Sequence, residues 1–96
     1  MIRFEYEHTD LFCDSANYSW VKRGAVYVPE LTHYGYDGLY GYSKVSASQW
    51  REVAKLVKRE LGLTGVRCTR NEQGDTLELY PQGGDSVIFI TCAESA

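Results

Sequence analysis

The feature that most constrains this chain is an apolar stripe in residues 47–61. The stripe has the i, i+3, i+4, i+7, i+11 spacing of one face of an α-helix and is formed by Trp50, Val53, Ala54, Val57 and Leu61. An amphipathic helix has to bury such a stripe against another element. We therefore expect one helix at residues 47–61 that covers the apolar face of a neighbouring structure.

Both ends of this helix carry boundary signals. At its start, Ser46 and Gln49 are expected to form a capping box. Val45 and Trp50 are expected to form a hydrophobic staple there. At its end, Gly62 suits the left-handed position that follows the last turn, and Leu63 can fold back on Val57. The capping residues thus predict the same boundaries as the stripe.

The chain before the helix begins with a strand. Residues 2–7 alternate strictly between apolar and charged side chains, which is typical of a strand with one buried face. His8 continues the apolar face. Residues 9–16 include Asp10 and Asp14 and are interpreted as a connection.

A second strand is expected at residues 17–23, where Tyr18 and Trp20 share one face. Gly24 can introduce a β-bulge, after which the strand resumes at residues 25–28. The sequence therefore predicts a long second strand that bends at this glycine.

Three more strands are expected after the helix. They lie at residues 66–70, 76–80 and 86–92, with turns at residues 71–75 and 81–85. In the middle strand, Leu77 and Leu79 point inward. The last strand is apolar on both faces, so we expect it to be central in the sheet and covered by the helix.

These elements predict a single α+β domain that spans residues 1–96. The hydrophobic content of 44% is ordinary for a globular protein of this size. We expect a mostly antiparallel sheet of about five strands with one helix packed on one face. The expected order is two strands, a tyrosine- and glycine-rich segment, the helix and three strands.

The tyrosine- and glycine-rich segment, residues 33–42, reads HYGYDGLYGY. Its four tyrosines are Tyr34, Tyr36, Tyr40 and Tyr42. Tyrosine and glycine are typical of partner-binding surfaces, because tyrosine offers a large amphipathic contact area at low entropic cost. We therefore expect these side chains to form a protein-binding surface, with Trp20 and Tyr18 as neighbours. The alternative is a purely structural hairpin.

Two conformations of this segment stay open. A hairpin with a type I′ turn at its Asp-Gly dipeptide, residues 37–38, would pair Tyr36 with Leu39 and, further out, Tyr34 with Gly41. An extended segment would instead place all four tyrosines on one face, because side chains alternate along a strand with a period of two. Either conformation exposes aromatic surface, which marks interaction sites.

Charge is unevenly distributed along the chain, whose net charge is −3. Residues 44–70 carry seven basic and two acidic side chains, whereas residues 71–96 carry five acidic side chains and no basic ones. The basic residues on the helix away from its apolar stripe are Arg51, Lys55, Lys58 and Arg59. Such a face can follow phosphates, so a nucleic-acid-binding accessory protein is the alternative function. A solvated face that complements the helix dipole explains the same cations.

No motif predicts a cofactor or a metal site. Zinc needs closely spaced ligand pairs, whereas Cys13, Cys68 and Cys92 are far apart, so we expect buried thiols. A small Cys/His enzyme is a second alternative, with the candidate groups Cys13, Cys68, Ser15, His8, His33 and Asp37. Because no spacing such as G-x-S-x-G joins them, we expect no enzymatic activity.

The sequence also carries signals about location. No apolar run approaches the ~20 residues of a membrane span, and the first residues lack the apolar region of a signal peptide. An odd number of cysteines is unusual for a small secreted domain. We therefore expect a cytoplasmic protein with no membrane partner.

Two stretches resemble small, uncharacterised proteins of bacterial temperate phages and prophages. They are ANYSWVKRG at residues 16–24 and GVRCTRNEQGDTLELYPQGG at residues 65–84. The resemblance assigns no activity to individual residues. It implies a small early or accessory phage protein in the cytoplasm of a bacterial host, and such proteins often bind and disable a host machine, including CRISPR and other defence systems.

Together, these observations predict a non-enzymatic protein-binding module that inhibits a host defence or transcription complex. Its partner would be a host protein or protein complex. Homodimer formation stays open.

Overall fold

The structure is a computed structural model that describes residues 1–29, 34–37, 42–73 and 76–93, with the backbone alone at residues 34–37, 42–44 and 73. In chain order the elements are β1 (Ile2–Phe12), β2 (Ser15–Val28), β3 (Tyr34–Asp37), β4 (Tyr42–Val45), α1 (Ala47–Glu60), β5 (Cys68–Gln73), β6 (Thr76–Pro81) and β7 (Ser86–Cys92). This is the expected order, with a strand pair in the tyrosine- and glycine-rich segment.

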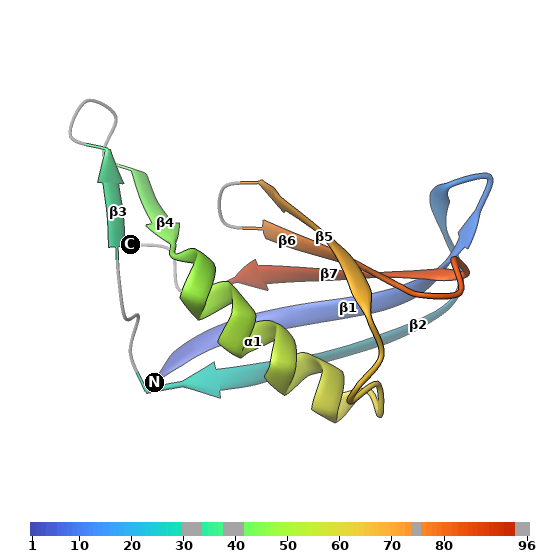
Figure 1. Cartoon of the computed structure of the whole chain (residues 1–96), viewed down its shortest axis with the longest axis horizontal. Helices are drawn as coiled ribbons and strands as arrows, with labels where there is room; N and C mark the ends of the chain where they lie inside the picture. Colours follow the sequence, from blue (N-terminus) through green and yellow to red (C-terminus); the bar gives the residue numbers. More distant parts are fainter. Residues whose placement is uncertain (30–33, 38–41, 74–75, 94–96) are drawn as a thin grey trace.

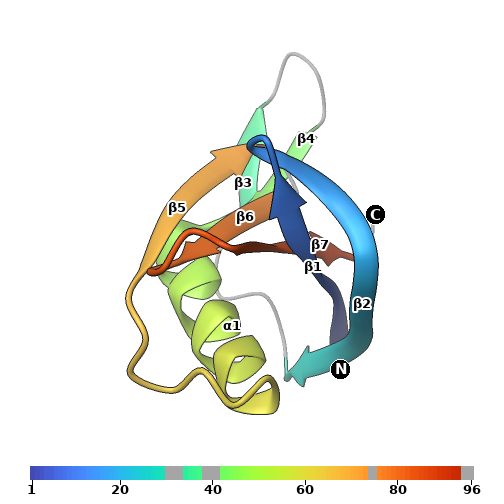
Figure 2. The same cartoon turned by 90° about the vertical axis from the view of Figure 1, so that its right-hand side faces the viewer.

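Five strands form one antiparallel sheet in the order β2-β1-β7-β6-β5, and β3 pairs with β4 in a separate sheet. Figure 1 shows the long β1–β2 ribbon running along the molecule, with α1 lying across the sheet. In Figure 2 the sheet curves from β5 round to β2, and α1 lies within the curve. The expected α+β fold, one helix packed on a five-stranded antiparallel sheet, is confirmed.

Helix α1 begins where its capping residues predict. The Ser46 hydroxyl accepts a hydrogen bond from the Gln49 amide at 3.2 Å, which satisfies one of the amides exposed at a helix start. Val45 and Trp50, the expected staple, belong to the same buried cluster. The N-terminal boundary at residue 47 is therefore confirmed.

A Schellman motif ends the helix. The Leu63 amide donates to the Lys58 carbonyl at 2.7 Å, and the Gly62 amide donates to the Arg59 carbonyl at 3.2 Å. Gly62 has a φ of +73°, the left-handed conformation expected there. Leu61 is the C-cap, so the helix ends one residue earlier than the apolar stripe suggested.

The core lies between α1 and the concave face of the sheet. The Trp50 ring meets the Phe4 ring edge-on, with centroids 5.5 Å apart and an interplanar angle of 73°. Leu77 and Leu79 of β6 point inward as expected and are fully buried. The cluster is completed by Val26, Val28, Val45, Val53, Ala54, Val57, Ile88 and Ile90. β7 supplies the two isoleucines from the centre of the sheet, as its apolar sequence predicted.

The first hairpin corrects one expectation. Residues 9–12, expected to form a connection, belong to β1, and Phe12 pairs with Ser15. Between them, Cys13 and Asp14 form a two-residue turn with φ values of +52° and +63°, as a type I′ turn requires. Residues 13–14 are not the Asn-Gly or Asp-Gly dipeptide that usually marks such a turn, so the turn was not expected.

Gly24 does not introduce the expected bulge. It pairs in register with Tyr6, and β2 is continuous there. A Cβ built on Gly24 would overlap the Tyr6 ring, so the glycine allows an aromatic ring to lie against the neighbouring strand. The register shift lies instead between Thr9 and Leu11.

The strand after the helix also differs from its expected range. It was expected at residues 66–70 but extends from Cys68 to Gln73, because residues 71–73 pair with β6 rather than turning. The Val66 amide instead donates to the Leu63 carbonyl at 3.0 Å within the connection from α1. The rest of the expected turn, residues 74–75, lies outside the described residues.

Candidate functional site

A groove of about 350 Å³ lies between α1 and β5, two elements that lie side by side in Figure 2. Its charged lining consists of Arg51, Lys55, Lys58, Arg59 and Arg70. Its apolar lining includes Ala54, Cys68 and Leu79. We call this site the cationic groove. Among its described lining residues there is no carboxylate.

The helix brings four of these cations to the groove because of their spacing. Arg51, Lys55 and Arg59 are four residues apart and lie above one another on the helix, beside the apolar stripe. Within the described part of the chain, none of these three side chains, nor that of Lys58, forms an ion pair. The structure thus gathers the four residues predicted for nucleic-acid binding at one site.

The fifth cation, Arg70, was not expected from the sequence to join the other four. Arg70 lies on β5 opposite Leu79 of β6 and therefore faces the helix. Its Nη2 contacts the Glu72 Oε1 at 2.7 Å, so this charge is partly compensated. Side chains alternate along a strand, so Cys68, Arg70 and Glu72 share one face of β5. This spacing was the signal in the sequence that could have placed Arg70 on the same face as Cys68.

The groove also contains one thiol. Burial raises the pKa of the Cys68 thiol above its usual value, although the nearby charge of Lys58 acts in the opposite direction. The thiol donates to the Val66 carbonyl at 3.8 Å. Cys68 is therefore a protonated part of the groove wall at neutral pH, not an activated nucleophile.

A second surface lies on β2, at the edge of the sheet. Its exposed large hydrophobic side chains, with those of the adjoining turn, are Phe12, Tyr18, Trp20, Val21 and Tyr27. We call this set the apolar edge. Tyr18 and Trp20 are 50% and 42% exposed, although aromatic side chains contribute most to stability when buried. An edge strand that carries so many exposed apolar groups can accept a partner.

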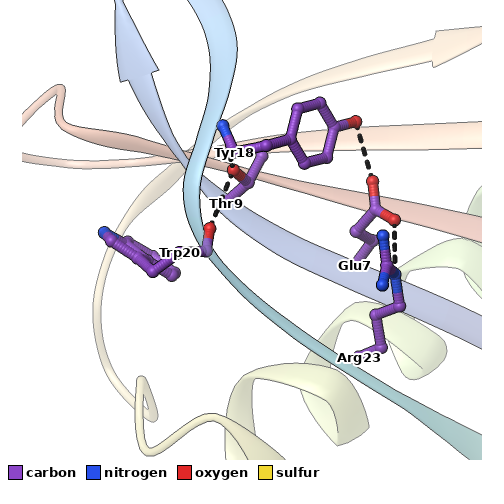
Figure 3. A network of polar contacts seen from close by, with 5 residues as sticks. All are labelled: Glu7, Thr9, Tyr18, Trp20 and Arg23. Atoms are coloured by element: carbon purple, nitrogen blue, oxygen red, sulfur yellow. Dashed lines mark hydrogen bonds and ion pairs between the residues drawn. The ribbon is translucent and has the colours of Figure 1, made fainter.

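A bulge interrupts the first part of β2. Thr9 pairs with Val21 and Leu11 pairs with Ala16, so residues 17–20 lie opposite the single residue Asp10. Figure 3 shows how Thr9 holds the bulge. Its hydroxyl accepts a hydrogen bond from the Tyr18 amide at 3.0 Å and donates one to the Trp20 carbonyl at 3.1 Å.

Asp10 secures the other side of the bulge. Its carboxylate accepts hydrogen bonds from the Ser19 amide at 2.9 Å, from the Ser19 hydroxyl and from the Asn17 side chain at 3.0 Å. The bonds from Ser19 and Asn17 hold the pKa of Asp10 well below its usual value. The bulge is therefore fixed by side-chain hydrogen bonds to the β2 backbone.

The Tyr18 ring is held over the outer face of the sheet. Its hydroxyl donates to one carboxylate oxygen of Glu7 at 2.8 Å, and the Arg23 Nε donates to the other at 2.8 Å (Figure 3). These two bonds, from Arg23 first and then from Tyr18, lower the pKa of Glu7. Tyr18 has a φ of +56°, so the bulge turns its side chain in a direction that a regular strand would not allow.

Trp20 covers a buried histidine on the opposite face. The rings of Trp20 and His8 meet edge-on with centroids 4.9 Å apart. His8 is 9% exposed, and neither ring nitrogen has a hydrogen-bond partner among the described residues. Burial, and then the neighbouring charge of Lys22, lower its pKa, so the imidazole is neutral at pH 7.

The predicted tyrosine surface is only partly described. Tyr34 pairs with Val45, and Tyr36 pairs with Ser43, so neither conformation expected for this segment has the observed register. The segment forms a hairpin, but its strands are joined through residues 38–41 instead of a two-residue turn at residues 37–38. Tyr40 lies outside the described residues, and for Tyr34, Tyr36 and Tyr42 only the backbone is described.

The structure does not bring Tyr18 and Trp20 to this hairpin. Figure 1 shows β3 and β4 toward one end of the long axis, whereas the β1–β2 turn lies at the other end. The bulge that carries Tyr18 and Trp20 begins at residue 17, three residues after Asp14 of that turn. The expected single surface is therefore divided between two regions.

The candidate catalytic groups lie on different elements. Cys13 is in the β1–β2 turn beside Ser15, His8 lies beneath Trp20, and Cys68 lines the cationic groove. His33 and the side chain of Asp37 lie outside the described part. Within that part, no three His, Cys, Asp or Glu side chains are arranged to hold a metal ion.

Comparison with protein-family models, curated proteins and solved structures found no match for this chain. In the described residues, no helix has both the length and the apolar composition needed to cross a membrane.

Proposed function

We propose that this chain is a non-enzymatic protein-binding module, encoded by a phage, that inhibits a defence or transcription complex in the cytoplasm of a bacterial host. The apolar edge is the observation that carries the binding role. Exposed aromatic side chains are the groups most often responsible for protein–protein affinity. Support for the phage context comes from the resemblance of residues 16–24 and 65–84 to phage proteins.

The form of the apolar edge favours binding over a passive structural role. Hydrogen bonds to Thr9 and Asp10 fix the bulge, and one to Glu7 fixes the Tyr18 ring. A surface that is already ordered loses little conformational entropy when a partner binds. The partner would gain contact with rigid aromatic groups instead of mobile side chains.

A pull-down from bacterial lysate tests this proposal. The baits are the parent protein and a Val21→Ser, Tyr27→Ser variant, since both residues are exposed on β2 and pair with β1 through their backbones. The matched control is a Thr69→Ser, Gln82→Ser variant, which changes exposed residues away from β2. Captured proteins would be identified by mass spectrometry and their binding repeated with purified components.

We expect the parent and the control to capture the same host defence or transcription complex, and the β2 variant to lose it while melting at the parent temperature. Retention of that complex by a folded β2 variant would contradict a role for the apolar edge. Two further double variants, Tyr34→Ala with Tyr36→Ala and Tyr40→Ala with Tyr42→Ala, test the hairpin in the same assay. If only these tyrosine variants lose the complex, the binding surface is the tyrosine- and glycine-rich segment and not the apolar edge.

Nucleic-acid binding is the second candidate function, and the cationic groove favours it. Five basic side chains line one concavity, which is the arrangement that follows a phosphate backbone. The net charge of −3 weakens long-range attraction of nucleic acid to the rest of the molecule. A folded Lys55→Glu, Arg59→Glu variant should lose binding to a labelled oligonucleotide if this function is correct.

A further inference from the structure

We propose that the cationic groove binds an extended, acidic peptide segment of a protein partner, with acidic and apolar residues in alternation. This inference rests on the proposed function in that the partner is a protein. It concerns a different site from the apolar edge, because the groove lies between α1 and β5 whereas the apolar edge lies on β2.

The spacing of the cations matches the spacing of an extended peptide. Arg51, Lys55 and Arg59 are separated by four helical residues each, which corresponds to steps of about 6 Å along the helix. Side chains on one face of an extended peptide recur every two residues, or about 6.6 Å. Three alternating carboxylates can therefore meet three successive cations of α1.

The apolar lining accounts for the residues between the carboxylates. The half-buried Cys68 presents apolar atoms within a groove of about 350 Å³, and the buried side chains of Ala54 and Leu79 form its floor. A purely anionic ligand would leave this surface covered by water. A peptide that alternates acidic and apolar residues uses both kinds of lining.

The strand beside the groove supplies its opposite wall. β5 is the last strand of the five-stranded sheet and has a neighbour on one side, β6. Cys68 and Arg70 of β5 line the groove across from the α1 cations. An extended segment that lies between the two elements would direct its carboxylates to α1 and its other face to β5.

Two features favour a peptide over nucleic acid. The described lining contains no aromatic side chain, whereas proteins that bind single strands usually stack bases on aromatic rings. Glu72 lies on β5 two residues beyond Arg70, so the stretch of positive charge along the groove is short. A long phosphate backbone would meet that carboxylate, whereas a short acidic segment would not.

Fluorescence anisotropy with three labelled probes tests the inference. The first probe is a heptapeptide in which three aspartates alternate with two leucines between terminal glycines. The second replaces the aspartates with lysines, and the third is a twelve-nucleotide oligo-dT. Each is titrated with the parent, with a Lys55→Glu, Arg59→Glu variant, and with an Arg3→Glu, Lys22→Glu variant that makes the same change in net charge outside the groove.

We expect saturable binding of the acidic peptide, weaker at higher salt, with at least a tenfold loss in the groove variant and little loss in the control. The lysine peptide should not bind. Backbone amide shifts in a ¹⁵N NMR titration should centre on Ala54, Lys58 and Cys68. Circular dichroism melts of both variants establish that they fold.

Three results would overturn the inference. Tighter groove-dependent binding of oligo-dT would assign the site to nucleic acid. Equal losses in the two charge-reversal variants would show non-specific attraction, and the absence of peptide binding would mean that the cations form a solvated helix face. None of these results affects the pull-down with the Val21→Ser, Tyr27→Ser variant, so failure of this inference is distinguishable from failure of the proposed function.

Discussion

At the scale of single residues, a few polar side chains in β1 determine the shape of β2. Thr9 is fully buried, and its hydroxyl bonds two backbone groups of the bulge. Asp10 and Glu7 add carboxylate hydrogen bonds on either side. The exposed position of Tyr18 and Trp20 therefore depends on residues about ten positions earlier in the chain.

Replacing Thr9 with valine should destabilise the protein by about 1–3 kcal/mol, because the Tyr18 amide and the Trp20 carbonyl both lose a partly buried hydrogen-bond partner. Urea unfolding measures the loss. Thr9→Ser is the matched control because it keeps the hydroxyl. Amide hydrogen exchange at Tyr18 should accelerate in Thr9→Val and stay slow in Thr9→Ser; equal exchange in the two variants would mean that this hydroxyl does not hold the bulge.

His8 should make stability depend on pH. Its pKa is lowered in the folded protein, so between that value and the unfolded value of about 6.5 the unfolded chain binds more protons. Stability is therefore highest above pH 7 and falls as the pH decreases through about 6.5. We expect a His8→Leu variant to lose less stability than the parent between pH 7 and pH 5 in urea titrations.

If His8→Leu and the parent have parallel pH profiles, burial of the imidazole beneath Trp20 has no energetic consequence.

At the scale of elements, the two hairpins show that turn preference is secondary to strand pairing. The Asp-Gly dipeptide at residues 37–38 favours a type I′ turn, yet the paired strands end at Asp37 and resume at Tyr42. The observed two-residue turn is Cys13-Asp14, which has no favourable turn residue other than Asp14. Long pairing of β1 with β2 determines where that turn falls.

A substitution in the Cys13-Asp14 turn should increase the stability of the protein. Asp14 has a φ of +63°, a conformation that costs most L-residues about 1 kcal/mol and glycine almost nothing. We therefore expect Asp14→Gly to raise the free energy of unfolding by about 0.5–1 kcal/mol, measured by urea unfolding. Ser15→Gly, one residue later in β2, is the control and should lower it; a loss of stability in Asp14→Gly would show that the aspartate side chain matters more than the backbone.

At the scale of the whole molecule, the curved sheet decides which groups are accessible. The expectation of buried thiols is wrong for Cys13, which is exposed in the β1–β2 turn, whereas Cys68 and Cys92 are half-buried; none of the three forms a disulfide. The helix and the sheet together also assemble the cationic groove from residues 51–79. Accessibility therefore follows from packing between distant parts of the chain.

Cysteine alkylation measures this packing. Iodoacetamide at neutral pH should modify Cys13 first, since it is exposed and burial raises the pKa of the Cys68 thiol. Intact mass should show one adduct in the native protein before the others, and three adducts after denaturation without reductant. A maximum of one adduct under denaturing conditions would reveal a disulfide and contradict the structure.

Local patterns in the sequence determined the helix, its caps and the strands at residues 76–80 and 86–92. These features depend on neighbours within a few residues, such as Ser46 with Gln49, or on a simple alternation of apolar side chains. The candidate cations of α1 could be found for the same reason. Periodicity also predicted that the last strand would be central, because a strand that is apolar on both faces has to be covered.

Only the tertiary structure decided the register of the hairpins, the bulge opposite Asp10, the burial of His8 and the presence of Arg70 in the groove. Each depends on contacts between residues far apart in sequence, such as Thr9 with Trp20 or the α1 cations with β5. Such contacts arise when α1 packs into a curved sheet, and local propensity carries no information about them. The sequence thus determined which elements form, whereas packing decided which of their side chains meet and which remain exposed to a partner.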